Sequence, residues 1–512
     1  MSVDTFAIIP RPRDVIAGDG FFECEGIPTA ESVEFAAEAA IFNEQMGGVF
    51  GGSITVPRIV CVKSVVETPA GNTAESYVLV IERDRVELRA PAAAGAYHGL
   101  QTLRQLFLSH RVEGVMAEAP PHFAVPCGEI RDAPRFGWRG FMLDCSRHFF
   151  EVASIKKILD ALSLHHINVF HWHLTDDQGW RLPVPQYPRL IEIGSRRRDL
   201  HSQREEYCGG YYTEDEIREI VAFAAGRHIT VVPEVDLPGH ASAVLAAYPE
   251  LGCTGGPYQV ESRHGIFDDI LCAGNDEIFT FVKAVFETLV RLFPGQYIHI
   301  GGDEAPKARW ESCPRCKKRL AEYGLDDMKQ MQACLTRRFA GMLADYGKTA
   351  VGWDEVLEGE SPKVSPLPAS LVVMSWRGVK GGLEATARGC RVVMSPNTGG
   401  CYFDYKHSAD PAEPGAYRKI ATTLESVYHT DPVVDGMSAD QAQLVLGGQA
   451  NLWSELIPAD RHAEYMIFPR ISALAEALWT PKALKNYASF TERLAVHRRR
   501  LDALGLLQYR GT

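Results

Sequence analysis

Short apolar runs alternate with stretches of helical spacing along residues 135–480. The apolar runs are 140–146, 167–176, 229–236, 297–303, 349–355, 371–376, 391–396 and 444–453. Between them lie helical stretches such as 152–166, 214–227, 276–293, 326–346 and 380–389. Unbroken apolar runs are typical of parallel strands that are buried on both faces. Eight such strands alternating with helices predict an α/β fold, a (β/α)₈ TIM barrel rather than an open sheet.

The segment before the barrel, residues 1–134, has a different pattern. Strands are predicted at 58–62, 77–81 and 85–89, the last from its alternation of polar and apolar residues, and a helix at 92–108. This indicates a smaller α+β supporting domain. Pro120-Pro121 and Asp132-Ala133-Pro134 predict a linker between this domain and the barrel. At the other end, residues 481–512 predict a basic amphipathic helical segment that packs on the barrel.

Composition excludes some classes of partner. The chain has 53 basic and 65 acidic residues, a net charge of −12, which argues against nucleic acid or an anionic membrane. No apolar run approaches the roughly 18 residues that would span a bilayer. The first residues, MSVDTFAIIPRPRD, contain no apolar segment of the kind found in secretory signals. We therefore expect a cytoplasmic location and no membrane span, while the sequence gives no indication of the oligomeric state.

The twelve cysteines are scattered along the chain. Several of them, such as Cys145 and Cys272, lie inside apolar runs, which is typical of reduced, buried thiols. Cys313 and Cys316 form the one suggestive C-x-x-C pair. Because a single pair of this kind is weak support for zinc, we expect a local disulfide or two unpaired thiols there. The prediction is that the protein uses no metal and no cofactor.

The ends of the predicted strands are unusually rich in polar and aromatic residues. The densest stretch is QYIHIGGDEAPKARW at 296–310, where a strand breaks at Gly301-Gly302 and is followed by Asp303 and Glu304. Glycines allow a tight turn and a close approach by a ligand. Similar strand ends carry Asp144, His171, His173, Asp176, Glu234, Asp236, Glu355, Gln449 and Asn451. Since the carboxyl ends of barrel strands meet on one rim, we expect a pocket of carboxylates and indoles there.

Such a pocket suits a carbohydrate. Sugar hydroxyls need acceptors such as Asp and Glu and donors such as Arg, and the apolar face of a sugar ring stacks on Trp. Cleavage of a glycosidic bond needs a proton donor on the leaving oxygen and support for an oxocarbenium-like centre. Adjacent residues of a strand point to opposite sides. Asp303 and Glu304 are therefore poorly placed to act as facing nucleophile and acid, so we expect them to have different tasks.

At this point a specific resemblance appears. HIGGDE at 299–304 resembles the signature of the glycoside hydrolase family 20 exo-β-N-acetylhexosaminidases. The resemblance extends over nearly the whole chain, through RGFMLDCSRHF (139–149), HWHLTDDQGWR (171–181), PEVDLPGHA (233–241), YFDY (402–405) and GGQANLWSE (447–455). It implies a retaining hydrolysis of terminal β-linked GlcNAc or GalNAc in which the 2-acetamido oxygen of the substrate attacks its own anomeric carbon. The intermediate would be an oxazolinium ion, and no nucleophile from the protein would be needed.

The resemblance also implies a role for each matching residue. Glu304 would be the general acid and then the base, Asp303 would orient the acetamido group, and Tyr402 would hydrogen-bond to its oxygen. Asp176 and His240 would support the acid. Substrate binding would fall to Arg147, Asp404 and Glu455, which match the residues that hold the sugar hydroxyls, and to Trp353, Trp376 and Trp453, which match the indole walls. The implied partner is a carbohydrate with a terminal β-HexNAc, such as chitobiose, a glycan or a glycolipid headgroup.

Three other hypotheses remain open on the sequence alone. His171, His173, His240, His299 and Asp303 also resemble the scattered ligands of a metal-dependent amidohydrolase barrel. A binding protein without activity could keep the same pocket. A retaining glycosidase could use Glu234 or Asp236 as its nucleophile, and such an enzyme would not require a 2-acetamido group on its substrate.

Overall fold

Eight parallel strands form a closed barrel in the order β13-β14-β15-β16-β17-β18-β7-β8. The structure, a computed structural model, describes residues 6–50, 59–67, 73–111, 121–198, 207–414 and 420–511. The barrel strands are β7 (Trp138–Asp144), β8 (Val169–His173), β13 (Thr230–Glu234), β14 (Tyr297–His299), β15 (Thr349–Trp353), β16 (Val372–Ser375), β17 (Arg391–Met394) and β18 (Val445–Leu452). Each lies within or across one of the eight predicted runs, so the predicted TIM barrel is confirmed.

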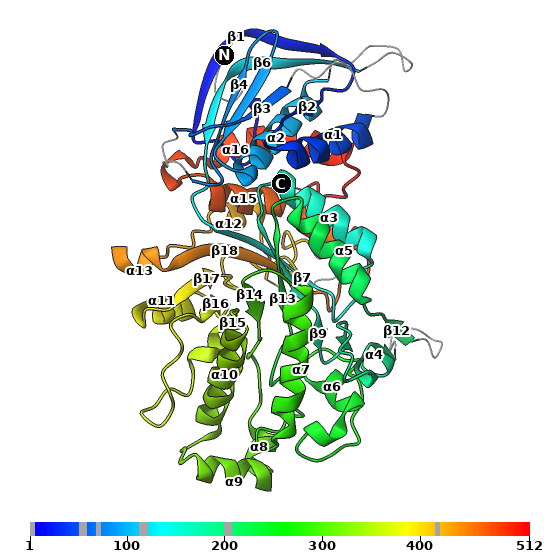
Figure 1. Cartoon of the computed structure of the whole chain (residues 1–512), viewed down its shortest axis with the longest axis vertical. Coiled ribbons are helices and arrows are strands. Elements are labelled where there is room, and N and C mark those ends of the chain that lie inside the picture. Colours follow the sequence, from blue (N-terminus) through cyan, green and yellow to red (C-terminus); the bar gives the residue numbers. More distant parts are fainter. Residues whose placement is uncertain are drawn as a thin grey trace.

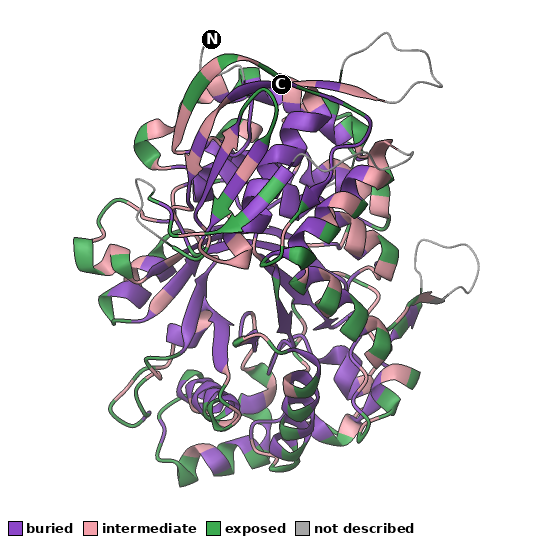
Figure 2. Cartoon of the chain, turned by 45° about the horizontal axis from the view of Figure 1, so that its top comes forward, coloured by how far each residue is buried: buried purple, intermediate pink, exposed green. Residues whose placement is uncertain are grey.

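Helices surround the barrel. The five helices predicted between the strands are present as α3 (Val152–Leu164), α5 (Glu214–Ala225), α7 (Glu277–Leu292), α10 (Met328–Asp345) and α11 (Lys380–Ala387). Shorter helices complete the ring and its loops: α4 (Arg189–Glu192), α6 (Ser242–Ala247), α8 (Ala308–Ser312), α9 (Pro314–Glu322), α12 (Leu424–Tyr428), α13 (Ala439–Gln443), α14 (Asp460–Ile467) and α15 (Arg470–Trp479). The strands are buried and the outer faces of the helices are exposed (Figure 2), as amphipathic spacing predicts.

A six-stranded sheet with two helices precedes the barrel and lies above it in Figure 1. Its order is β1-β6-β4-β5-β3-β2. The elements are β1 (Asp14–Glu25), β2 (Ala30–Glu31), α1 (Ala36–Phe50), β3 (Ile59–Lys63), β4 (Tyr77–Ile81), β5 (Val86–Ala90), α2 (Ala93–Ser109) and β6 (His122–Asp132). Leu79, Leu88 and Leu103 are fully buried between the sheet and α2. The predicted α+β domain is therefore present.

One prediction about this region is wrong. The stretch between Pro121 and Pro134 was expected to be linker, but β6 runs through it and pairs with both β1 and β4. Phe123, Val125 and Ile130 are fully buried on this strand and supply the apolar contacts that hold it in the sheet. Pro126 lies within the strand, opposite Phe21 and next to the irregularity between Ala17 and Phe21 of β1, a position where a strand tolerates proline.

The C-terminal helix α16 (Tyr487–Ala503) contacts both parts of the molecule. Arg493 donates to the carbonyl of Ile8 at 2.7 Å and forms an ion pair with Glu476 of α15, also at 2.7 Å. Arg500 donates to the carbonyl of Ala7 at 2.7 Å. The helix thus ties the barrel to the first residues of the sheet domain. Among the described residues, we found no helix with the length and apolar character required to cross a bilayer.

Four two- or three-residue strands form small ribbons beside the barrel. β9 (Thr175–Asp176) pairs with β10 (Gly179–Trp180), and β11 (Arg196–Arg198) pairs with β12 (Tyr207–Gly209). The first ribbon matters for function because it bends the chain after β8, so that Asp176 and Asp177 face the barrel rim.

Candidate active site

A pocket of about 190 Å³ opens at the carboxyl ends of the barrel strands. Nine of the residues proposed from the sequence line it: Arg147, Asp303, Glu304, Trp353, Trp376, Tyr402, Asp404, Trp453 and Glu455. The other two, Asp176 and His240, lie directly behind this lining and are described below. Gln178, His264, Gly265 and Ile266 complete the wall. The rim predicted from the strand ends is therefore a single concave site.

The turn after β14 presents Asp303 and Glu304 to the pocket. Gly301 and Gly302 have φ values of 66° and 102°, in the left-handed region that favours glycine. A Cβ at Gly301 would lie 1.7 Å from Oδ1 of Asp236, and the N–H of Gly302 donates to the same oxygen at 2.9 Å. The turn is therefore built around a close approach to Asp236, which only glycine at position 301 allows.

Asp303 is a buried carboxyl beside a second one. Its side chain lies against Asp236, with which it forms a hydrogen bond. Burial raises the pKa of Asp303 well above its usual range, and the nearby charge of Asp236 raises it further. Burial also raises the pKa of Asp236 to about 6. Two carboxyl groups in contact cannot both ionise easily, so this pair holds a proton between them near neutral pH.

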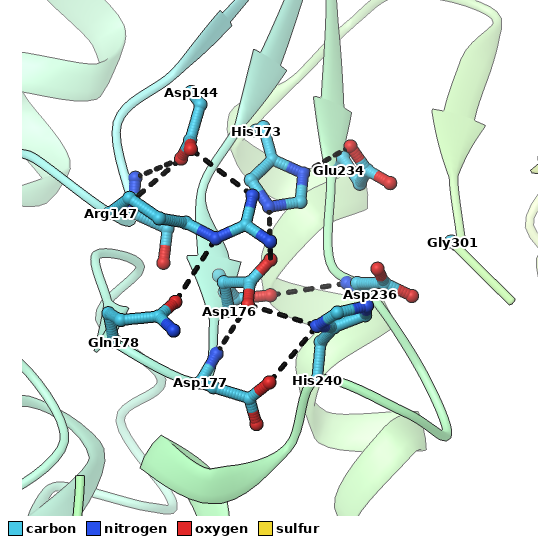
Figure 3. A network of polar contacts seen from close by, with 12 residues as sticks. Asp144, Arg147, His173, Asp176, Asp177, Gln178, Glu234, Asp236, His240 and Gly301 are labelled. Atoms are coloured by element: carbon cyan, nitrogen blue, oxygen red, sulfur yellow. Dashed lines mark hydrogen bonds and ion pairs between the residues drawn. The ribbon is translucent and has the colours of Figure 1, made fainter. Parts of the chain in front are cut away.

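Glu304 lies at the end of a chain of polar contacts. His240 Nε2 is 3.6 Å from Oε2 of Glu304. On its other side, His240 Nδ1 is 3.1 Å from Asp176 and 3.0 Å from Asp177 (Figure 3). Burial alone would lower the pKa of His240, but the carboxylates of Asp176 and Asp177 outweigh burial and raise that pKa well above its usual value. His240 is thus held as a cation next to Glu304.

Arg147 is fixed from three sides in the same network (Figure 3). Its guanidinium contacts Asp176 at 2.8 Å, Asp144 at 3.2 Å and Gln178 at 3.1 Å, and lies 5.0 Å from the ring of Trp453. Because the guanidinium is already held by protein carboxylates, its position in the pocket does not depend on a ligand.

The indole walls are held by their own N–H groups. Trp353 donates to Glu234 at 2.8 Å, Trp376 donates to Glu355 at 2.9 Å, and Trp453 donates to the hydroxyl of Tyr402. Trp376 and Tyr402 are stacked, with ring centroids 6.5 Å apart. An indole fixed through its N–H keeps its face in one orientation, which suits stacking on a flat apolar surface.

Three of the four histidines that suggested a metal-dependent barrel converge on Glu234, beneath the pocket, whereas His240 contacts Asp176 and Asp177. His171 Nε2 is 2.9 Å, His173 Nδ1 2.5 Å and His299 Nδ1 3.0 Å from its carboxylate oxygens. Burial opposes ionisation of Glu234, but these imidazoles outweigh burial and hold its pKa well below the usual range. Burial lowers the pKa of His171 to about 4, whereas Glu234 and Asp176 outweigh burial and raise the pKa of His173 well above its usual value. His173 is therefore the ring that balances the charge of this fully buried carboxylate.

Four lining residues were not identified from the sequence. Gln178 follows Asp177 inside a recognised motif, so its position could have indicated a role. His264, Gly265 and Ile266 lie between β13 and α7, in a stretch without helix or strand around them. No periodicity or motif marks that stretch, and only the folded chain brings it to the pocket.

A (β/α)₈ barrel whose strand ends form an acidic, tryptophan-walled pocket is typical of enzymes that act on carbohydrates. Comparison of the sequence with models of known protein families identifies one family. The model described as "Glycosyl hydrolase family 20, catalytic domain" matches residues 136–482, and "Glycosyl hydrolase family 20, domain 2" matches residues 5–133. The chain belongs to glycosyl hydrolase family 20.

Individual relatives agree with this assignment. The beta-hexosaminidase of Porphyromonas gingivalis is 39% identical over 98% of this chain, which spans 64% of that relative's length. The beta-N-acetylhexosaminidase of Cellulomonas fimi is 30% identical, over 98% of this chain and 95% of its own length. A family 20 exo beta-N-acetylglucosaminidase from Vibrio harveyi, solved with N-acetylglucosamine, superposes with a TM-score of 0.87 at 29% identity, covering 99% of this chain and 78% of that one.

Proposed function

We propose that this protein is an exo-acting β-N-acetylhexosaminidase that removes terminal β-linked GlcNAc or GalNAc. The single observation that carries the proposal is the placement of two adjacent carboxyl groups with different surroundings in one pocket. Asp303 is buried against Asp236, whereas the side chain of Glu304 is 32% exposed and faces a cationic histidine. Adjacent carboxyls in different environments suit two different tasks in one reaction.

In this proposal Glu304 protonates the leaving oxygen and later activates water. Asp303 orients the 2-acetamido group, whose oxygen attacks the anomeric carbon, and the hydroxyl of Tyr402 donates to that oxygen. His240 and Asp176 position Glu304. Arg147, Asp404 and Glu455 hold the sugar hydroxyls, and Trp353, Trp376 and Trp453 enclose the ring.

The geometry gives little support to a nucleophile from the protein. Glu234 has no exposed surface, and its oxygens contact three histidines and the indole of Trp353. Asp236 is 1% exposed, and its Oδ1 accepts from the backbone of Gly302. Neither residue lines the pocket, so neither can reach an anomeric carbon bound there. This favours a nucleophile within the substrate.

The test is hydrolysis of two matched aryl β-glycosides, one with a 2-acetamido group and one with a 2-hydroxyl, with and without a thiazoline analogue of the oxazolinium ion. Cleavage of only the acetamido sugar, inhibited by the thiazoline, is expected. Equal cleavage of both, insensitive to the thiazoline, would return the nucleophile to the protein. Binding without turnover would support the inactive binding protein, and hydrolysis of the acetamido amide bond instead of the glycosidic bond would support the metal-dependent amidohydrolase.

The substrate class follows from the same pocket. A carbohydrate with a terminal β-HexNAc, as in chitobiose, a glycan or a glycolipid headgroup, presents the acetamido group that Asp303 and Tyr402 would hold. Turnover of paired GlcNAc and GalNAc substrates would rank the two sugars. The cytoplasmic location expected from the sequence stays a prediction, which fractionation of the native cells would test.

A further inference from the structure

Four cysteines from three separate segments meet at the end of the barrel that is farthest from the sheet domain, beside α9 (Figure 1). Cys253 follows a short 3₁₀ turn (Pro249–Leu251), Cys272 lies just before α7, and Cys313 and Cys316 flank the first turn of α9. One ligand atom from each lies within 4.8 Å of all the others. The sequence showed only Cys313 and Cys316 as a pair, because the other two become their neighbours only on folding.

Three of the six sulfur–sulfur distances match the edge of a zinc–thiolate tetrahedron, and the other three are within 4.8 Å. Cys272 Sγ is 3.6 Å from Cys316 Sγ and 3.9 Å from Cys313 Sγ, and Cys253 Sγ is 3.8 Å from Cys316 Sγ. Four sulfurs around one zinc ion, each about 2.3 Å from the metal, are about 3.8 Å apart. Two disulfides would instead produce two close pairs, whereas here Cys272 and Cys316 each have two neighbours at nearly the same separation.

The surroundings also suit a bound cation. Cys272 and Cys316 are fully buried, Cys313 is 4% exposed, and Cys253 is partly exposed, which leaves a route of entry. A buried thiolate needs a positive partner, and deprotonated sulfur is the form that binds zinc.

Backbone groups complete the outer shell of this cluster. The N–H of Gly274 donates to the sulfurs of both Cys272 and Cys316. A Cβ on Gly274 would lie 2.2 Å from the carbonyl carbon of Arg315, so only glycine lets this loop lie against α9. The side chain of Arg315 donates to Gly252 at 2.7 Å and adds positive charge beside the sulfurs. Hydrogen bonds of this kind to metal-bound sulfur orient the ligands of structural metal sites.

We propose that Cys253, Cys272, Cys313 and Cys316 bind one structural zinc ion. Four thiolates leave no open position on a tetrahedral metal, so the ion has no catalytic role. It joins α9 to the stretch between β13 and α7, the same stretch that brings His264, Gly265 and Ile266 to the pocket. The zinc site therefore holds one wall of the active site from outside.

The test is the zinc content of protein purified without a polyhistidine tag and without chelators, measured by mass spectrometry of the metal. We expect one zinc per chain, and release of that zinc when a mercurial reagent titrates the thiols. Cys272→Ser and Cys316→Ser are expected to lose zinc and to unfold at lower temperature. Cys334→Ser is the control, because Cys334 is a partly buried cysteine on α10 outside the cluster. This variant is expected to keep its zinc and the unfolding temperature of the wild type.

If the serine variants fail to fold, Cys253→His replaces one thiolate by an imidazole, which also binds zinc. This variant is expected to contain zinc but to bind it more weakly than the wild type. Replacing zinc by cobalt in the wild-type protein is expected to give the sulfur-to-metal charge-transfer absorption of a tetrahedral thiolate site. Any of three results would overturn the proposal: four thiols present as two disulfides, a metal other than zinc at one per chain, or zinc that the Cys272→Ser and Cys316→Ser variants retain, which would place it elsewhere.

Discussion

His240 Nε2 lies 3.6 Å from Oε2 of Glu304, and both residues have left-handed backbone, with φ values of 46° and 43°. A non-glycine residue in this region costs on the order of 1–3 kcal/mol. Two such residues in contact, on turns after β13 and β14, are maintained because the surrounding packing and the Asp176–His240 ion pair hold them. The strain therefore marks the point where unfavourable backbone conformations are accepted to place Glu304, the proton donor that we propose, beside His240.

Glu304→Gln is expected to reduce kcat by about 10²–10⁴-fold on substrates whose leaving group must be protonated, and by much less on an activated aryl glycoside. The reason is that an amide cannot donate the required proton, while a good leaving group does not need it. Kinetics with a natural disaccharide and an aryl substrate measure the difference. Glu311→Gln, an exposed change on α8, is the control. Equal losses on both substrates would contradict the acid role.

Asp303→Asn is expected to lower kcat on acetamido substrates by about 10²–10³-fold, because the positive charge that develops on the acetamido group loses its carboxylate partner. The thiazoline analogue should bind more weakly to this variant. Inhibition constants and kcat measure both effects, with Asp268→Asn, an exposed aspartate, for comparison. An unchanged kcat would remove Asp303 from the mechanism.

Asp236→Asn is expected to move the acidic limb of the pH profile of kcat/KM to lower pH. The charge of Asp236 helps to raise the pKa of Asp303, so its removal lets Asp303 ionise at lower pH. The profile is measured from pH 4 to pH 8 against that of Asp435→Asn, an exposed change far along the chain. A limb that stays in place would show that Asp303 is not the group that titrates there.

Gly301→Ala is expected to abolish most activity, whereas Gly347→Ala should not. Both glycines have φ near 70°, so both variants have the same backbone strain. Only at Gly301 does the new Cβ meet another group, Oδ1 of Asp236, while Gly347 has open space. Activity and melting temperature measured together separate the two effects. Equal activity in both variants would contradict the close approach.

Asp132 joins the sheet domain to the barrel and should make stability depend on pH. Fully buried, it accepts from Tyr77 at 3.0 Å and from Trp479 at 2.9 Å, and burial raises its pKa to about 7. The folded pKa exceeds the unfolded value of about 3.9, so this group's contribution is fully present below pH 4 and is lost as pH rises through 7.

Asp132→Asn removes that dependence, since an amide does not titrate. It also leaves the donors of Tyr77 and Trp479 poorly matched, at a cost of about 1–3 kcal/mol. The free energy of unfolding, measured with urea at pH 5, 6, 7 and 8, should show the largest gap between wild type and variant at pH 5. A gap of constant size would contradict the assigned titration, and Asp435→Asn should show no gap.

The barrel could be predicted because each strand is an unbroken apolar run and each helix has one apolar face. The pocket could be predicted because strand ends of a barrel meet on one rim, and this rule alone brought Asp303 and Trp353 together. Other features depend on contacts between distant parts of the chain. Strand β6 lacked a clear signal between its prolines, and His264 lies in a stretch without periodicity. Cys253 and Cys272 are separated from Cys313 by α7 and β14, so no local spacing reveals that they are its neighbours.

The closure of the barrel has a consequence for how the chain is made. β7 pairs with β18, and the backbone of Ser454 donates to Asp144 across 310 residues of sequence. A growing polypeptide therefore keeps this edge of β7 unpaired until residues 445–452 of β18 have left the ribosome. An unpaired strand edge can form hydrogen bonds with other chains, and pairing between strands far apart in the sequence is slow. Arg147 follows β7 and Glu455 follows β18, and both line the pocket, so a translation product that stops before β18 would lack part of this site.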